Sequence, residues 1–227
     1  MKIGKLIVID GTDGSGKHTQ TILLLKTLRA AGYKVATLDF PQYYKNFFGA
    51  LTGRYLAGDF GNPTKISPYL ASVLYAADRF ESKKKIQKWL KEGRIVVLDR
   101  YASANQIHQG AKINDPKKRR KFLAWLDKME FGIFGLPRPD LIIYLHVNPK
   151  IAHTLVAKKA ARAYARGRSH DGHEGNLAFQ RASEEQSLKL VRKMNHWKKI
   201  ECVERENILS PEKIAKKVWQ VILKIIQ

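Results

Sequence analysis

The stretch VIDGTDGSGKHTQTILLL, residues 8–25, decides how the chain is interpreted. It joins a short apolar run to a Gly-rich turn and then to residues with helical spacing. Gly11, Gly16 and Lys17 follow the Walker A pattern G-x-x-x-x-G-K in the strand-to-helix context that this pattern needs. Glycines let backbone N–H groups point inward, the helix N-terminus adds partial positive charge, and the lysine supplies a cation. The stretch therefore predicts a site for the phosphates of a nucleotide such as ATP.

The expected ATP-binding residues are Gly11, Thr12, Asp13, Gly14, Ser15, Gly16, Lys17, His18 and Thr19. His18 replaces the Ser or Thr whose hydroxyl usually contacts Mg²⁺ in this pattern. Mg²⁺ keeps several waters and needs few protein ligands when phosphates are present. Asp13 and Asp99 could hold those waters, whereas a neutral imidazole suits Mg²⁺ poorly and is expected to face solvent or the backbone. We therefore expect a Mg²⁺ cofactor held through water by Asp13 and Asp99.

Apolar runs alternate with helical patterns along the chain. Strands are expected at residues 6–9, 34–40, 95–98, 141–145 and 200–203, and helices at 19–31, 67–90, around Phe122 to Met129 and from Pro211. Strands that are apolar throughout and separated by helices indicate a parallel sheet covered on both faces. The pattern predicts an α/β, P-loop NTPase-type three-layer fold with about five parallel strands flanked by helices. Its ligands would bind at the carboxyl ends of the strands.

The length and composition suit one domain spanning residues 1–227, with 44% hydrophobic residues. Residues 158–175, KKAARAYARGRSHDGHEG, differ from the rest because they are rich in Arg, His and Gly and poor in core residues. Such a segment is either an exposed loop or a lid that closes over a ligand. We expect a basic lid there.

The net charge is +22, with 42 Lys and Arg against 20 Asp and Glu. Such a field attracts polyanions and anionic small molecules alike, so nucleic acid is a possible but not favoured partner. The densest basic run, KKRRK at 117–121, is typical of the solvated first turn of a helix. The sequence has no run of 18 consecutive apolar residues, so no membrane span is expected. The N-terminus also lacks the layout of a signal peptide. Because Cys202 is the single cysteine and cannot form an internal disulfide, a reducing cytoplasm is expected, with Cys202 half-buried in a strand.

Three further motifs follow the loop DGTDGSGKHT: FPQYY at 40–44, VLYAADRF at 73–80 and LDRYASANQIHQGAK at 98–112. In order and spacing they resemble the thymidylate kinase family over residues 4–150. In that family the residue after the lysine varies, so His18 is not anomalous. The resemblance implies phosphorylation of dTMP to dTDP with Mg-ATP, in dTTP synthesis. It also implies a homodimer formed through helices that flank the sheet.

The resemblance assigns roles to residues of the acceptor site. Tyr75 would stack on the thymine ring, Arg79 would bond a base carbonyl, and Phe40 would line the nucleoside pocket. Arg100 would clamp the acceptor phosphate, as the planar guanidinium allows, and Tyr43 would contact the same phosphate.

Other roles follow from the same motifs. Asp13 would touch the sugar 3′-hydroxyl or a metal-bound water, and Asn105 and Gln109 would bond the base edge. His108 stands where an aromatic ring often packs against the deoxyribose, which leaves the exclusion of a 2′-hydroxyl open. Asp39 replaces an arginine common in the family, so acceptor-phosphate binding would rely on Arg100 and Tyr43.

Structural alternatives remain for some of these residues. Tyr75 could belong to the core, and Gln109 could be a helix C-cap. Arg79 could pair with Asp78 or Glu81 on a helix surface.

The chemistry needs no general base, because the acceptor phosphate is already anionic. Catalysis would consist of positioning and charge neutralisation by Lys17, Asp13, Arg100 and Mg²⁺. Some family members carry an arginine inside the phosphate loop where this chain has Gly14, so a lid arginine would supply the missing charge. Arg162, Arg166 and Arg168 are the candidates, and Arg166 and Arg168 are favoured as catalytic.

Two other functions stay open. The chain could phosphorylate another nucleoside monophosphate or a deoxynucleoside, although the latter needs a base for the hydroxyl and FPQYY carries no carboxylate. It could also be a basic P-loop protein that binds nucleic acid, with a steep salt dependence and no phosphoryl transfer.

Overall fold

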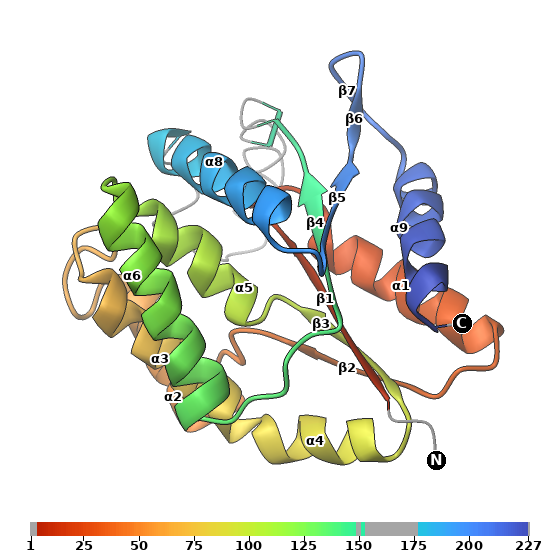
Figure 1. Cartoon of the computed structure of the whole chain (residues 1–227), viewed down its shortest axis with the longest axis horizontal. Helices are drawn as coiled ribbons and strands as arrows, with labels where there is room; N and C mark the ends of the chain where they lie inside the picture. Colours follow the sequence, from red (N-terminus) through yellow and green to blue (C-terminus); the bar gives the residue numbers. More distant parts are fainter. Residues whose placement is uncertain (1–3, 149–150, 153–176, 227) are drawn as a thin grey trace.

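The computed structural model describes residues 4–148, 151–152 and 177–226. Five parallel strands form a sheet in the order β2-β3-β1-β4-β5 (Figure 1). The strands are β1 Lys5–Gly11, β2 Val35–Asp39, β3 Ile95–Asp99, β4 Leu141–His146 and β5 Trp197–Glu201, followed by a hairpin of β6 Val203–Glu204 and β7 Asn207–Ile208.

Helices cover both faces of the sheet. Figure 1 shows α1 and α9 on one side and α4, α5 and α8 on the other, with α2, α3 and α6 further out. The bounds are α1 Lys17–Ala30, α2 Phe47–Ala57, α3 Pro68–Glu81, α4 Lys83–Lys91, α5 Ala102–Ala104, α6 Pro116–Asp127, α8 Leu177–Lys193 and α9 Pro211–Ile226, with π-helical turns η1 Asn105–Gln109 and η2 Lys128–Ile133.

Side-chain alternation along the strands builds two cores. Ile7 and Ile9 of β1 pack with α1 and α9, whereas Leu6 and Val8 pack on the opposite side with Ile86 of α4. All five of these side chains are fully buried. Because helices cover both faces of the sheet, the strand sequences are nearly continuous apolar runs. The expected three-layer α/β fold with a parallel sheet of five strands is confirmed.

Two expected elements are wrong in their bounds. The single helix expected at 67–90 is two helices, α3 and α4, separated at Ser82. α3 packs against α2, whereas α4 packs against β3, and one straight helix could not do both. The last strand begins at Trp197 rather than at residue 200, because exposed Lys198 and Lys199 interrupt its apolar pattern although Trp197 is buried.

Other expectations concern single segments and residues. The basic residues 117–121 lie mostly exposed at the start of α6. Cys202, expected to be half-buried in a strand, is instead fully buried and lies between β5 and β6. Among the described residues, no helix is long and apolar enough to cross a membrane. The lid expected at 158–175 lies outside the described residues.

Candidate active site

The loop between β1 and α1 has the backbone that its glycines permit. Gly11, Gly14 and Gly16 have φ values of 157°, 81° and 84°, a region that other residues rarely adopt. A Cβ on Gly11 would lie 2.5 Å from the Ser15 hydroxyl oxygen, so the loop could not close around a larger residue. α1 begins at Lys17, directly after the loop. The loop and the helix N-terminus thus form the arrangement that binds phosphate groups.

Lys17 lies inside this loop. Its Nζ donates to the carbonyl oxygens of Gly11 at 3.0 Å and Thr12 at 2.9 Å, and lies 3.8 Å from Oδ1 of Asp13. Burial, and then the nearby Arg100, lower the pKa of Lys17 to about 8. The buried hydroxyl groups of Thr12 and Ser15 have no hydrogen-bond partner within the described ranges. Buried polar groups of this kind normally find a partner, which is what a phosphate ligand would supply.

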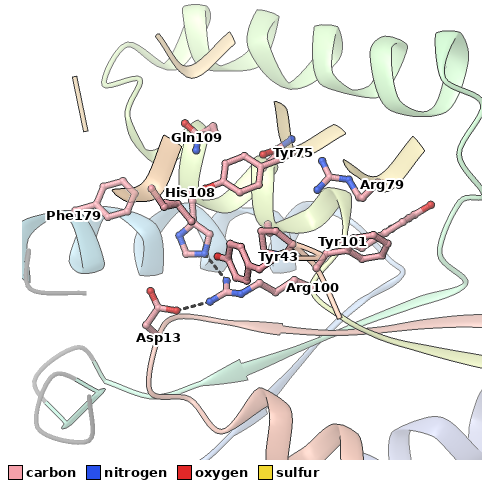
Figure 2. Close-up of a pocket in the computed structure, with 14 residues that line it drawn as sticks. Asp13, Tyr43, Tyr75, Arg79, Arg100, Tyr101, His108, Gln109 and Phe179 are labelled. Atoms are coloured by element: carbon pink, nitrogen blue, oxygen red, sulfur yellow. Dashed lines mark hydrogen bonds and ion pairs between the residues drawn. The ribbon is translucent and has the colours of Figure 1, made fainter. Parts of the chain in front are cut away.

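Arg100 connects the loop to the cavity beside it. It follows β3 with a φ of 65°, and its Nη2 donates to the carboxylate of Asp13. Its Nη1 lies 3.0 Å from Nε2 of His108 (Figure 2). A guanidinium only donates, so Nε2 of His108 is the acceptor in this contact. Arg100 is therefore held between the phosphate loop and η1.

Two carboxylates of the loop region have pKa values shifted in opposite directions. Asp10 is fully buried, accepts from Gly11 N at 2.8 Å and from Ser103 Oγ at 2.5 Å, and has its pKa raised by burial. Burial alone would also raise the pKa of Asp13, but Arg100 and Lys17 outweigh it and hold that pKa far below its usual range. Asp13 thus stays ionised. Sequence analysis missed Asp10, although a carboxylate inside the apolar run LIVID was a visible signal.

The oxygen donors near the loop suit Mg²⁺. The carboxylate of Asp99 is 14% exposed and its Oδ2 lies 3.8 Å from Nδ1 of His18, whose side chain is 81% exposed. Asp13 already pairs with Arg100, so Asp99 is the freer carboxylate of the two. The described residues contain no group of three or more His, Cys, Asp or Glu side chains able to hold a metal. A magnesium ion here would therefore depend on phosphates and waters, which its chemistry allows.

One cavity adjoins Arg100, and every substrate-binding residue expected from the sequence lines it. The lining comprises Asp13, Phe40, Pro41, Tyr43, Leu56, Tyr75, Arg79, Arg100, Tyr101, Ala104, Asn105, His108, Gln109 and Phe179. Figure 2 shows Asp13, Arg100 and His108 at one end, with Tyr75 and Arg79 at the other. We call these the phosphate end and the base end.

The base end is closed by a buried ion pair. Arg79 is 2% exposed, and its Nε and Nη2 donate to Glu130 at 2.8 and 2.5 Å. The alternative that Arg79 pairs with Asp78 or Glu81 on a helix surface is therefore wrong. Nδ2 of Asn105 also donates to Glu130, at 3.0 Å.

Tyr75 and Gln109 also line this cavity. The ring of Tyr75 packs edge-on against Tyr55, with ring centroids 6.0 Å apart, while its side chain also lines the cavity. Oε1 of Gln109 is buried without a partner among the described residues. Gln109 is not a helix C-cap, because the chain stays helical through Ala111.

Several site residues gave little or no sequence signal. Glu130 lies in η2, in a stretch that looks like an ordinary helix end. Leu56, Tyr101 and Phe179 reach the cavity from α2, from the end of β3 and from α8. Arg162, Arg166 and Arg168, proposed to supply charge from the lid, lie outside the described residues.

Comparisons with known proteins identify the family of the chain. The family profile described as thymidylate kinase matches residues 9–211. The chain is 34% identical to a thymidylate kinase of Mycobacterium tuberculosis (strain ATCC 25618 / H37Rv) over 175 residues, covering 77% of this chain and 80% of the relative. It is 32% identical to a human thymidylate kinase over 145 residues, covering 64% of this chain and 62% of the relative.

A solved structure has the same fold. The thymidylate kinase of Candida albicans superposes with a TM-score of 0.75 at 23% identity, covering 98% of this chain and 92% of that one. With the profile spanning most of the sequence, the chain belongs to the thymidylate kinase family.

Proposed function

We propose that the chain transfers the γ-phosphoryl group of Mg-ATP to dTMP, giving ADP and dTDP for dTTP synthesis. The observation that carries the proposal is the bridge at the phosphate end. Oδ1 of Asp13 pairs with Arg100 and lies 3.8 Å from Nζ of Lys17, so the loop cation and the acceptor-site arginine lie beside the same carboxylate oxygen. Donor and acceptor phosphates bound at these two cations would meet in the same cleft.

The phosphate end performs the transfer. An acceptor phosphate oxygen bonds to the γ-phosphorus as the bond from that phosphorus to the bridging oxygen breaks, and ADP leaves. Lys17 neutralises the donor phosphates, and Arg100 with Tyr43 holds the acceptor. Asp13, released from Arg100 by the incoming phosphate, contacts the sugar 3′-hydroxyl or a metal-bound water. The lid arginines, with Arg166 and Arg168 favoured, complete the charge neutralisation.

The base end recognises the nucleoside. Tyr75 offers a ring face for stacking, and Phe40 forms part of the wall. Arg79, Asn105 and Gln109 provide the polar groups for the base edge, and the unpartnered Oε1 of Gln109 supports this. His108 lies beside the sugar.

Mg²⁺ fits the loop through Asp99, with Asp13 as a second carboxylate, both acting through bound water. The ion would neutralise charge on the donor phosphates. This chain's part is to hold both carboxylates beside the loop.

We further propose one domain over residues 1–227, a cytoplasmic location and a homodimer. The dimer proposal rests on an exposed apolar face of α2 and α3, formed by Phe47, Leu70, Val73 and Phe80, which are 39–71% exposed. Exposed apolar side chains gathered on neighbouring helices often mark an interface. Leu70→Glu should convert a dimer to a monomer in light scattering, and a wild-type monomer would contradict the proposal.

The function is tested by incubating the protein with Mg-ATP and dTMP, dUMP, dCMP, dGMP, UMP or thymidine, and measuring ADP. Activity highest with dTMP supports the proposal. Activity with thymidine alone indicates a deoxynucleoside kinase. The absence of transfer together with salt-sensitive oligonucleotide binding indicates a nucleic-acid-binding protein.

A further inference from the structure

Glu130 holds both residues that we assign to the base edge. It is 1% exposed, lies in η2 and does not line the cavity. Its Oε2 accepts from Nε of Arg79, and its Oε1 accepts from Nη2 of Arg79 and from Nδ2 of Asn105. One buried carboxylate therefore joins side chains from α3 and η1, which are distant in the sequence.

The contacts of Asn105 fix which way its amide faces. Nδ2 donates to Glu130 Oε1 at 3.0 Å and to the carbonyl oxygen of Ser72 at 3.2 Å. An ionised carboxylate and a carbonyl can only accept, so the NH₂ group must face them. Oδ1 then faces the other way and accepts no hydrogen bond from the part of the chain that the structure describes. Asn105 consequently offers the cavity an acceptor.

The contacts of Arg79 determine which hydrogen-bonding group it presents to the cavity beside Asn105. Nε and Nη2 are both used by Glu130, and Nη1 donates to no other described residue. A guanidinium carries donors only. Arg79 therefore offers the cavity a donor, beside the acceptor of Asn105.

This pair of groups distinguishes two kinds of pyrimidine. Thymine has an acceptor at O4 beside the N3–H donor, whereas cytosine has an N4 donor beside the N3 acceptor. We propose that Glu130 is a positioning residue that selects 4-oxo over 4-amino pyrimidines by holding Arg79 as donor and Asn105 as acceptor. The proposal rests on the proposed function, because it assumes a pyrimidine monophosphate in this cavity. A site built this way rejects the mismatched base, since polar groups would stay unpaired.

The test is Glu130→Gln, which keeps the shape and places an NH₂ group against donors of Arg79 or Asn105. kcat/KM for dTMP and for dCMP is measured with Mg-ATP in wild type and variant. We expect kcat/KM for dTMP to fall by about 10- to 100-fold, and the dTMP-to-dCMP ratio by about tenfold or more. The ratio does not depend on the fraction of folded enzyme, so partial unfolding cannot imitate the effect.

Matched variants separate positioning from packing. Leu126→Ala opens a hole in the apolar cluster beside η2 and should leave the ratio unchanged, as should Glu185→Gln at an exposed carboxylate. Glu130→Asp keeps the charge with a shorter reach and should retain more selectivity than Glu130→Gln. If Glu130→Gln is insoluble, a selectivity in Glu130→Asp equal to wild type contradicts the proposal, and a reduced one supports it.

The outcomes distinguish this inference from the function it rests on. A wild-type protein that does not phosphorylate dTMP overturns the proposed function itself. A wild-type preference for dTMP that Glu130→Gln leaves intact, or that Leu126→Ala lowers equally, overturns only the role of Glu130.

Discussion

The two ends of the cavity each contain an arginine paired with a carboxylate, and the two pairs differ in exposure. At the phosphate end, Arg100 and Asp13 are 20% and 26% exposed. At the base end, Arg79 and Glu130 are 2% and 1% exposed. The first pair can exchange its carboxylate for a phosphate that brings its own charge. The second cannot open without leaving a buried charge uncompensated, so it acts as fixed structure.

The difference teaches that an arginine's role depends on what surrounds it. Arg100 is reached by solvent and by the loop, and its surroundings include Asp10, Asp13 and Asp99, whose charges raise its pKa despite burial. Arg79 has two of its nitrogens permanently engaged, so only a remaining donor is left for a ligand. We infer that the phosphate end binds its ligand when Arg100 exchanges the carboxylate of Asp13 for a phosphate. The base end binds through hydrogen-bonding groups that are already fixed in place.

The largest effect is expected from removing the cations of the phosphate end. Lys17→Ala and Arg100→Ala should each lower kcat/KM for dTMP by about 10³-fold or more, because each cation faces developing or transferred charge. Steady-state kinetics with both substrates varied measures this. An Arg100→Ala enzyme with the wild-type rate and an unchanged KM for dTMP would show that the acceptor site lies elsewhere.

The second prediction compares how much each arginine contributes to the free energy of unfolding. Arg79→Met should lower the free energy of unfolding by about 3–5 kcal/mol, because the buried Glu130 loses its counter-ion and keeps only the hydrogen bond from Asn105. Arg100→Met should change it by about 1 kcal/mol or less, because Asp13 is partly solvated. Urea unfolding of both variants checks this. The double variant Arg79→Met/Glu130→Leu should recover part of the lost unfolding free energy. Equal losses in Arg79→Met and Arg100→Met would contradict the comparison.

A further cation, the half-buried Lys112, sharpens the comparison because it pairs with no carboxylate of the described residues. Its Nζ donates to the Pro63 carbonyl oxygen at 2.8 Å, and burial lowers its pKa to about 8. Since the unfolded-state pKa lies near 10.4, the unfolded chain binds more protons between these values, and stability should rise with pH there. The unfolding free energy of wild type relative to Lys112→Met should increase from pH 8 to 10. Lys198→Met, at an exposed lysine, serves as the control, and a flat difference for Lys112 would contradict the expectation.

The smallest effect concerns the residue after the loop lysine. His18→Ser restores a hydroxyl but should change kcat by only about threefold, because Mg²⁺ keeps its waters and depends little on protein ligands here. Initial rates across a magnesium titration measure it. A gain of tenfold or more would mean that the missing hydroxyl limits this enzyme.

Local sequence predicted most of the phosphate end. The glycines, Lys17 and Asp13 lie within seven residues, and their backbone conformation is dictated by glycine itself. The motifs FPQYY, VLYAADRF and LDRYASANQIHQGAK each contribute residues that line one cavity. Their side-chain roles stay predictions until the variants above are measured.

The amino-acid sequence by itself determined the parallel three-layer fold and the loop, because both follow from patterns between residues close along the chain. Only the tertiary structure decided where the helix at Ser82 divides, that Asp13 meets Arg100, and that Arg79 meets Glu130. The two ion pairs join residues 51 and 87 positions apart, and the helix divides because α3 and α4 pack against different elements. A charged residue such as Glu130 looks the same in sequence whether it faces solvent or a buried guanidinium.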